Sequence, residues 1–275
     1  MSQPLPSIDT SCDGHVHTRF CHHASGEMED YVRAAIASGL KELCFLEHME
    51  VGVRYREVTW LTENDFDDYF REGERLRRIY RNKIGIGLGV EVGYSPGHLA
   101  TLRERLANRP WDRIGLSFHY ALLPGQSDHL NLLSRKEENI RRARDLGADA
   151  ILSHYFSSLI DAVTQLPADV LCHLDAALRY LPDLTYRPDH MEQIDALLDL
   201  VRQKGLALEI NTSGLPIRGE PFPAAAIVAK AVQREIPLVA GSDAHRPEDV
   251  GRHFDRLADY IMQAVCPQPQ PGPGR

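Results

Sequence analysis

The sequence has few cysteines, and they are not arranged for cross-linking or for a thiolate metal site. The 275 residues include 5 cysteines, and no two of them form a C-x-x-C pair. An odd number of scattered thiols provides no disulfide framework for a chain of this size. The cysteine pattern therefore fits a reducing compartment, and we expect the protein to be cytoplasmic.

Long apolar runs and basic leader segments are also missing. The first residues, MSQPLPSIDTSC, contain no basic region followed by an apolar one. No apolar run approaches the roughly 18–20 residues of a membrane span. We therefore expect neither export nor a membrane partner.

Positive charge is in short supply. Lys and Arg number 31 against 39 Asp and Glu, so the formal net charge is -8. This charge repels a polyanion at long range, but a small phosphorylated substrate needs only a local basic patch. We expect a small phosphate ester as the partner and no nucleic acid, whereas the composition is silent on the oligomeric state.

What is present fits one large α/β domain. Hydrophobic residues make up 43% and charged residues 25% of the chain, which is average globular usage. Single α/β barrels commonly reach roughly 200–250 residues. The last residues, CPQPQPGPGR, are too rich in proline and glycine to continue a helix. We expect one barrel domain over residues 1–265 and a flexible tail over 266–275.

Short apolar runs alternate with longer amphipathic ones, which is typical of βα units around a parallel sheet. Residues 121–134 are expected to be a loop insertion. Strands are predicted at 15–17, 42–48, 84–94, 113–120, 169–175, 206–213 and 236–245. Helices are predicted at 28–40, 66–81, 136–147, 191–205 and 222–236.

Polar residues of metal-ligand type follow the predicted strands directly. In a parallel barrel the carboxyl ends of the strands meet on one face, so these residues would share one basin. A cluster of His and carboxylate suits two or three divalent ions such as Zn, Mn or Fe. The residues at these ends are Glu47, His48, Glu91, His119, His173, Asp175, Glu209, Asn211, Asp243 and His245.

The N-terminal stretch CDGHVHTRFCHH adds four histidines within nine positions. His15 and His17 flank one valine, so on an extended strand both side chains point to the same face and can grip one ion. Other histidines have no such context. His22 and His154 fit either interpretation, and the residues that we interpret as ordinary surface or core histidines are His98, His129, His190 and His253.

Taken together, these motifs resemble the PHP (polymerase and histidinol phosphatase) metal-dependent phosphoesterases, particularly their histidinol-phosphate phosphatase branch. The resemblance covers almost the whole chain and is carried by DGHVHT, FCHHA, FLEH, GVEVGY, SFHY, CHLD, EINTSG and GSDAHRPEDVG. It implies an α/β fold, a distorted TIM-like (β/α)7 barrel, with up to three metal ions. The ligands it implies are His15, His17 and Asp243 for the first ion, His119 and His173 for the second, His23, His48 and His245 for the third, and Glu91 as a bridge between the first two.

The expected reaction is hydrolysis of L-histidinol phosphate to L-histidinol and phosphate by a hydroxide that bridges metal ions. Phosphoryl transfer also calls for a cation on the phosphate oxygens. Arg179 is the first candidate, and Arg218 and Arg246 follow, although each could be an ordinary surface cation. The residues expected to carry the chemistry are Glu91, Asp243, His245 and Arg179. The side chains expected to shape the substrate end, or else to cap their strands, are Glu209, Asn211 and Ser213.

Two other functions compete with this one. The first is a PHP-family phosphatase or phosphodiesterase that acts on a different small phosphate or nucleotide. The second is a metal-binding regulatory module without catalysis. A complete set of inward-facing polar ligands argues against the second, because their burial is costly without a chemical purpose.

Overall fold

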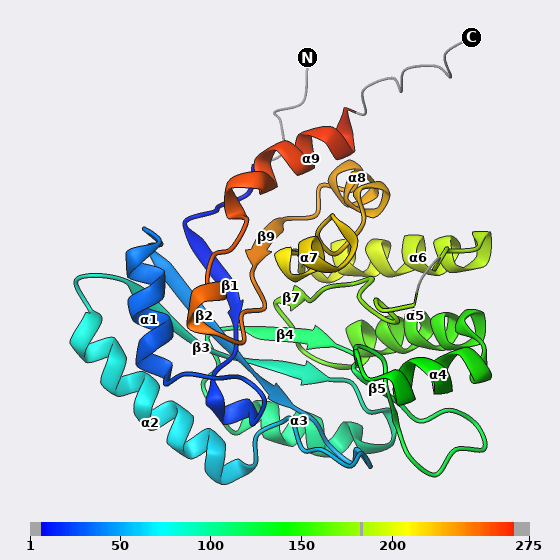
Figure 1. Ribbon diagram of the computed structural model, residues 1–275, viewed down its shortest axis with the longest axis horizontal. Helices are drawn as coiled ribbons and strands as arrows, with labels where there is room; N and C mark the ends of the chain where they lie inside the picture. Colours follow the sequence, from blue (N-terminus) through cyan, green and yellow to red (C-terminus); the bar gives the residue numbers. More distant parts are fainter. Residues whose placement is uncertain (1–6, 182–183, 267–275) are drawn as a thin grey trace.

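Seven parallel strands form a nearly closed barrel in the computed structural model, which describes residues 7–181 and 184–266 (Figure 1). The barrel closes where β1 meets the chain after β9: His17 N donates to Ala244 O at 2.9 Å, and Asp243 N donates to His15 O at 2.9 Å. The predicted (β/α)7 barrel is confirmed. In sheet order, the strands are β1 (Cys12–Val16), β2 (Glu42–Met49), β3 (Gly85–Gly93), β4 (Ile114–Ser117), β7 (Val170–Leu171), β8 (Ala207–Asn211) and β9 (Leu238–Gly241).

Helices surround this barrel, and each of the five predicted ones is present with shifted ends (Figure 1). Helices α3, α5, α7 and α9 were not predicted from the sequence. The tail expected over 266–275 lies outside the described residues, apart from Cys266. The helices are α1 (Met28–Ala37), α2 (Glu63–Tyr80), α3 (Leu99–Ala107), α4 (Glu137–Leu146), α5 (Ala148–Gln165), α6 (Pro188–Lys204), α7 (Leu215–Arg218), α8 (Ala225–Gln233) and α9 (Leu257–Val265).

The omission of α5 has a physical reason. Its buried residues, such as Ile151, Leu152, Tyr155, Phe156 and Leu159, do form one apolar stripe at helical spacing. However, the helix starts immediately after Gly147, which ends α4 with a φ of 88°. Gly147 is therefore both the C-cap of α4 and the N-cap of α5, and no loop sequence separates the two helices.

The loop expected over residues 121–134 contains a short hairpin. Strand β5 (Tyr120–Ala121) pairs antiparallel with β6 (Leu130–Asn131). His129 N donates to Arg54 O at 2.9 Å, and this bond ties the hairpin to the loop after β2. The two loops therefore stand together at the carboxyl end of the barrel.

The barrel interior is narrow and filled with small side chains. Cys44, Leu46, Val170 and Cys172 form an apolar cluster separate from the main core beneath the helices. Space is so limited that a Cβ on Gly115 would lie 2.7 Å from Cys172 Sγ. The histidines and carboxylates of the strands gather beyond this cluster, at the carboxyl end of the barrel, whereas Arg113 Nη1 donates to Gly14 O of β1 at 3.2 Å.

Candidate metal centre

Alternate residues along each strand point into the barrel, and the last of them are polar. In the β2–β3 register Cys44 pairs with Gly87, and four residues further on His48 pairs with Glu91. Gly115 of β4 lies on the other side of Glu91. Inward-pointing residues two positions apart on a strand therefore lie in successive layers of the barrel. The layer at the carboxyl end consists of histidines and carboxylates.

A first group of four ligand atoms forms around the H-x-H pair. His15 Nε2 lies 2.9 Å from His17 Nε2, and each of these atoms lies 3.6 Å from Glu91 Oε2. Asp243 Oδ1 is 3.4 Å from His17 Nε2. In a tetrahedral site with bonds of about 2.0–2.1 Å, ligand atoms are about 3.3 Å apart. The spacing therefore suits one divalent ion.

A second group shares Glu91 through its other oxygen. Glu91 Oε1 lies 2.7 Å from His173 Nε2 and 3.0 Å from His119 Nε2. The two carboxylate oxygens thus face different sets of imidazoles, as a ligand that bridges two ions must. The fold thus brings together Glu91, the implied bridge, and His119 and His173, the implied ligands of the second ion.

The third implied group is more open. The His23 ring centroid lies 4.5 Å from that of His245 and 5.3 Å from that of His48. His22 instead turns to Asp65, with its Nε2 3.5 Å from Oδ2. The fold therefore brings His23, and not its neighbour, to this group.

Burial keeps most of these imidazoles neutral, the form that binds metals. Burial and the nearby His48 and His245 hold the pKa of His17 well below its usual value. Burial likewise lowers the pKa of His245 to about 4, an effect that Asp243 only partly offsets. For Glu91 burial favours the neutral acid, but the surrounding histidines hold its pKa well below the usual range. His15 and His119 are the exceptions: despite burial, nearby carboxylates raise the pKa of His15 well above its usual value and that of His119 to about 10.

Unpaired polar atoms test whether metal ions fit this centre. Among the described residues, His245 Nε2 is buried and makes no hydrogen bond, whereas Glu91 Oε2, also buried, faces His48 Nδ1 at 2.8 Å. A buried lone pair without a partner is costly, and a divalent cation would satisfy it. Nitrogen and oxygen donors in this number suit zinc, manganese or iron, so the residues present fit the ions.

The far side of most ligand histidines is already occupied. His15 Nδ1 lies 2.6 Å from Glu209 Oε1, and His119 Nδ1 lies 2.8 Å from Glu50 Oε1. His23 Nδ1 contacts Cys21 O at 2.9 Å, whereas His245 Nδ1 contacts the main-chain oxygen of Asp243 at 2.9 Å. In His15 and His119, Nε2 then faces the other ligands, His17 Nε2 at 2.9 Å and Glu91 Oε1 at 3.0 Å respectively.

The three candidate arginines lie in different surroundings. Arg179 is half-buried, and its Nη1 is buried without a hydrogen-bond partner among the described residues. Arg218 binds Asp175 with both terminal nitrogens, at 2.9 and 3.2 Å. The Arg246 side chain is 64% exposed and lies 3.9 Å from Glu248. Among the described residues, Arg179 and Arg218 each have a buried guanidinium nitrogen without a hydrogen bond, but only in Arg179 is it a terminal nitrogen, Nη1, whereas in Arg218 it is Nε.

The expected substrate-end residues divide into two positions. Ser213 Oγ donates to Asp243 Oδ2 at 3.3 Å, and Asn211 Oδ1 caps the turn by accepting from Ser213 N at 3.0 Å. Glu209 lies behind His15 and also accepts from His173 N at 2.8 Å. Its hydrogen-bond partners are His15, the main chain of His173 and the Asn211 side chain.

The sequence did not single out Glu50 or Asp13, and it placed Glu47 only among the polar residues at the strand ends. Asp13 is buried and accepts hydrogen bonds from Ser242 N and Gly251 N, at 3.0 and 2.8 Å, which joins β1 to the chain after β9. Glu47 accepts from Thr18 N at 2.9 Å. The only available signal was their adjacency to ligand motifs.

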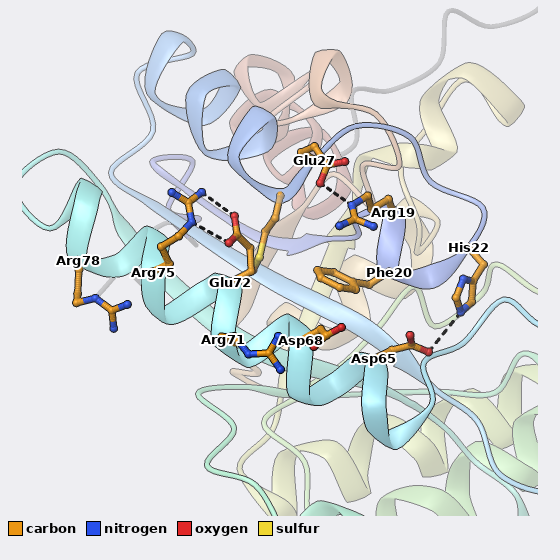
Figure 2. A pocket seen from close by; sticks show the side chains of 11 residues that line it. Arg19, Phe20, His22, Glu27, Asp65, Asp68, Arg71, Glu72, Arg75 and Arg78 are labelled. Atoms are coloured by element: carbon orange, nitrogen blue, oxygen red, sulfur yellow. Dashed lines mark hydrogen bonds and ion pairs between the residues drawn. The ribbon is translucent and has the colours of Figure 1, made fainter.

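A surface groove of about 540 Å³ lies beside the centre, between the segment around His22 and helix α2 (Figure 2). Its charged side chains face one another: Arg19 Nε binds Glu27 Oε2 at 2.5 Å, and Arg75 Nε binds Glu72 Oε2 at 2.8 Å. Opposite charges are therefore balanced along the groove, and it has no marked preference for an anion.

A nearly closed parallel barrel with His and carboxylate ligands at its open end defines the class: a barrel protein built for several divalent ions. The chain matches the PHP domain over residues 13–213 and the PHP-associated region over 227–266. It therefore belongs to the PHP family. None of the helices described is long and apolar enough to cross a bilayer.

Relatives agree with this membership. The chain is 32% identical over 255 residues to the probable histidinol-phosphatase of Deinococcus radiodurans, covering 92% of each chain. A crystal structure from Listeria monocytogenes has a TM-score of 0.77 at 25% identity, covering 89% of this chain and 98% of the other. The Lactococcus lactis histidinol phosphate phosphatase, solved with zinc, L-histidinol and phosphate, has a TM-score of 0.73 at 19% identity and covers 94% of each chain.

Proposed function

We propose that the protein is a metal-dependent phosphomonoesterase that hydrolyses L-histidinol phosphate to L-histidinol and phosphate. The observation that carries the proposal is the placement of Glu91, whose two oxygens face two separate groups of imidazoles. The relative of 32% identity, named a probable histidinol-phosphatase over 92% of each chain, supports this substrate.

Nine residues would hold three ions, as the sequence motifs imply. Divalent ions bound in this way lower the pKa of a coordinated water and neutralise phosphoryl oxygens. Glu91 and Asp243 provide the negative charge that holds the ions together, and both are kept ionised in the centre. His245 offers its unpaired Nε2. The proposed ligands are His15, His17, His23, His48, Glu91, His119, His173, Asp243 and His245.

Arg179 is the proposed phosphate-binding cation. Its Nε donates to Leu133 O at 3.3 Å, which anchors the guanidinium while Nη1 stays unpaired. A guanidinium fork matches the geometry of phosphate oxygens. Arg218 is less suited, because its fork already binds Asp175. Asn211 and Ser213 are proposed to shape the edge of the site next to Asp243.

The test is a comparison of phosphate esters. The protein is freed of metal, reconstituted separately with manganese, zinc and iron, and assayed for kcat/KM on a panel that includes L-histidinol phosphate. The proposal predicts the highest kcat/KM for L-histidinol phosphate. A higher value for another small ester or nucleotide would assign the other PHP-family function, and no turnover of any ester by fully loaded protein would assign a regulatory module.

A further inference from the structure

Two buried carboxylates outside the ligand set stand directly behind metal-facing histidines. Glu209 is 2% exposed, with its Oε1 2.6 Å from His15 Nδ1, and Glu50 is 4% exposed, with its Oε1 2.8 Å from His119 Nδ1. The Nε2 of His119 then faces Glu91 Oε1 at 3.0 Å. Each carboxylate accepts from the outer nitrogen and leaves the inner nitrogen free to bind a cation.

Each carboxylate also occupies the space of a missing side chain. A Cβ added at Gly93 of β3 would overlap both oxygens and Cδ of Glu50, and a Cβ added at Gly241 of β9 would overlap Oε1 of Glu209. Neither Gly93 nor Gly241 has a φ in the left-handed region. Close approach of the carboxylate, rather than backbone conformation, is therefore what requires glycine here.

Fixing a histidine does not by itself require a buried carboxylate. His23 and His245 are held at Nδ1 by main-chain oxygens, which carry no net charge. Burying a carboxylate disfavours its charged form, so a buried carboxylate is costly unless it is paired. The two carboxylates are thus expensive features, and both lie at the deep part of the centre.

We propose that Glu50 and Glu209 are positioning residues, which hold His119 in the orientation that binds the second ion and His15 in the orientation that binds the first. Gly93 and Gly241 are part of the same arrangement, because the absence of a side chain at these positions leaves space for the two carboxylates. The inference rests on the proposed function only in that metal ions occupy the deep sites. Glu50 and Gly93 give the cleaner test, because a Cβ at Gly241 would also lie 2.9 Å from the His15 Cβ.

The first experiment measures metal affinity of the full chain, by chelator competition with zinc and by elemental analysis. Glu50→Ala is expected to weaken the second ion about 10- to 100-fold, the usual cost of losing such a partner. Glu50→Gln retains an acceptor for Nδ1, so its affinity is expected to fall between Glu50→Ala and wild type. Equal affinities for wild type and Glu50→Ala would overturn the proposal.

The matched control is a glycine on the same strand. A Cβ at Gly87 would lie 2.8 Å from Cys44 Sγ, well below the ligands. Gly87→Ala is therefore expected to lower the melting temperature without changing zinc affinity, whereas Gly93→Ala lowers affinity about 10-fold or more. Equal effects of the two substitutions on zinc affinity would show that Gly93 is needed for packing and not specifically for the position of Glu50.

A double-mutant cycle links Gly93 to Glu50. In the Glu50→Asp background the carboxylate is shorter, so Gly93→Ala is expected to cost less than about threefold in zinc affinity, far less than in wild type. Additive losses would overturn the link. These readouts do not use turnover: wild type that binds no zinc would instead refute the proposed function.

Discussion

The floor of the metal centre differs from its rim. The floor consists of His15, His17, Glu91, His119 and His173, and the rim consists of His23, His48 and His245. No floor residue is more than 6% exposed, whereas the side chains of His48 and His245 are 12% and 28% exposed and His23 is exposed.

The two parts are also held differently. Floor residues lie on or directly after barrel strands, and carboxylates back two of their histidines. At the rim, His23 follows His22, which has a left-handed φ of 63°, and His245 follows Asp243 with a φ of 52°. At the rim, His23 and His245 are therefore held by turns and main-chain contacts, whereas His48 lies on β2 opposite Glu91. We infer that the floor holds its ions tightly and the rim exchanges its ion more readily.

The largest effect is expected at the floor, from Glu91→Gln. The substitution removes the bridging charge with little change in volume, so kcat/KM should fall at least about 100-fold, roughly 2.7 kcal/mol. Steady-state kinetics measure the loss, and circular dichroism checks that the fold is kept. Unchanged turnover with full metal content would show that the Glu91 charge does not bridge two ions. The floor would then not be more important for activity than the rim.

A smaller effect is expected at the rim, from His23→Ala. One ion per chain should bind about 10- to 100-fold more weakly, while the floor ions remain. Elemental analysis during stepwise dialysis against a chelator measures the order of release. His22→Ala is the control, since His22 faces Asp65, and it should retain wild-type metal content. Loss of the floor ions before the rim ion would contradict the comparison.

Arg179→Ala should lower kcat/KM at least about tenfold, because one charge-assisted phosphate contact is worth roughly 1.5–3 kcal/mol. Lysine should restore it only in part, since an ammonium lacks the planar fork. Inhibition by inorganic phosphate should weaken in parallel. If both quantities stay within about twofold of wild type, roughly 0.4 kcal/mol, the phosphate-binding role is wrong.

The smallest effect is expected from Arg246→Ala. The side chain is 64% exposed, and its contact with Glu248 at 3.9 Å is a surface ion pair of little energetic weight. We expect kcat/KM to change less than about twofold. A tenfold loss in the same assay would show that substrate reaches the outermost part of the rim.

The floor residues could be predicted from the sequence because the position of a residue along a barrel strand determines where its side chain lies. His15 and His17 share a face at a spacing of two, and Glu91 ends an apolar strand, so both signals were local. Glu50 could not be identified in this way, because its role depends on space left by Gly93 on the next strand. The pairing of Arg218 with Asp175 likewise joins residues 43 positions apart.

The most direct test is anomalous diffraction from crystals of the reconstituted protein. The account predicts two ions about 3.5–4 Å apart that share Glu91, one bound by His15, His17 and Asp243 and the other by His119 and His173. A third, weaker peak should lie among His23, His48 and His245. Reconstituted crystals without ions between these residues, or with Glu91 contacting a single ion, would contradict the central claim.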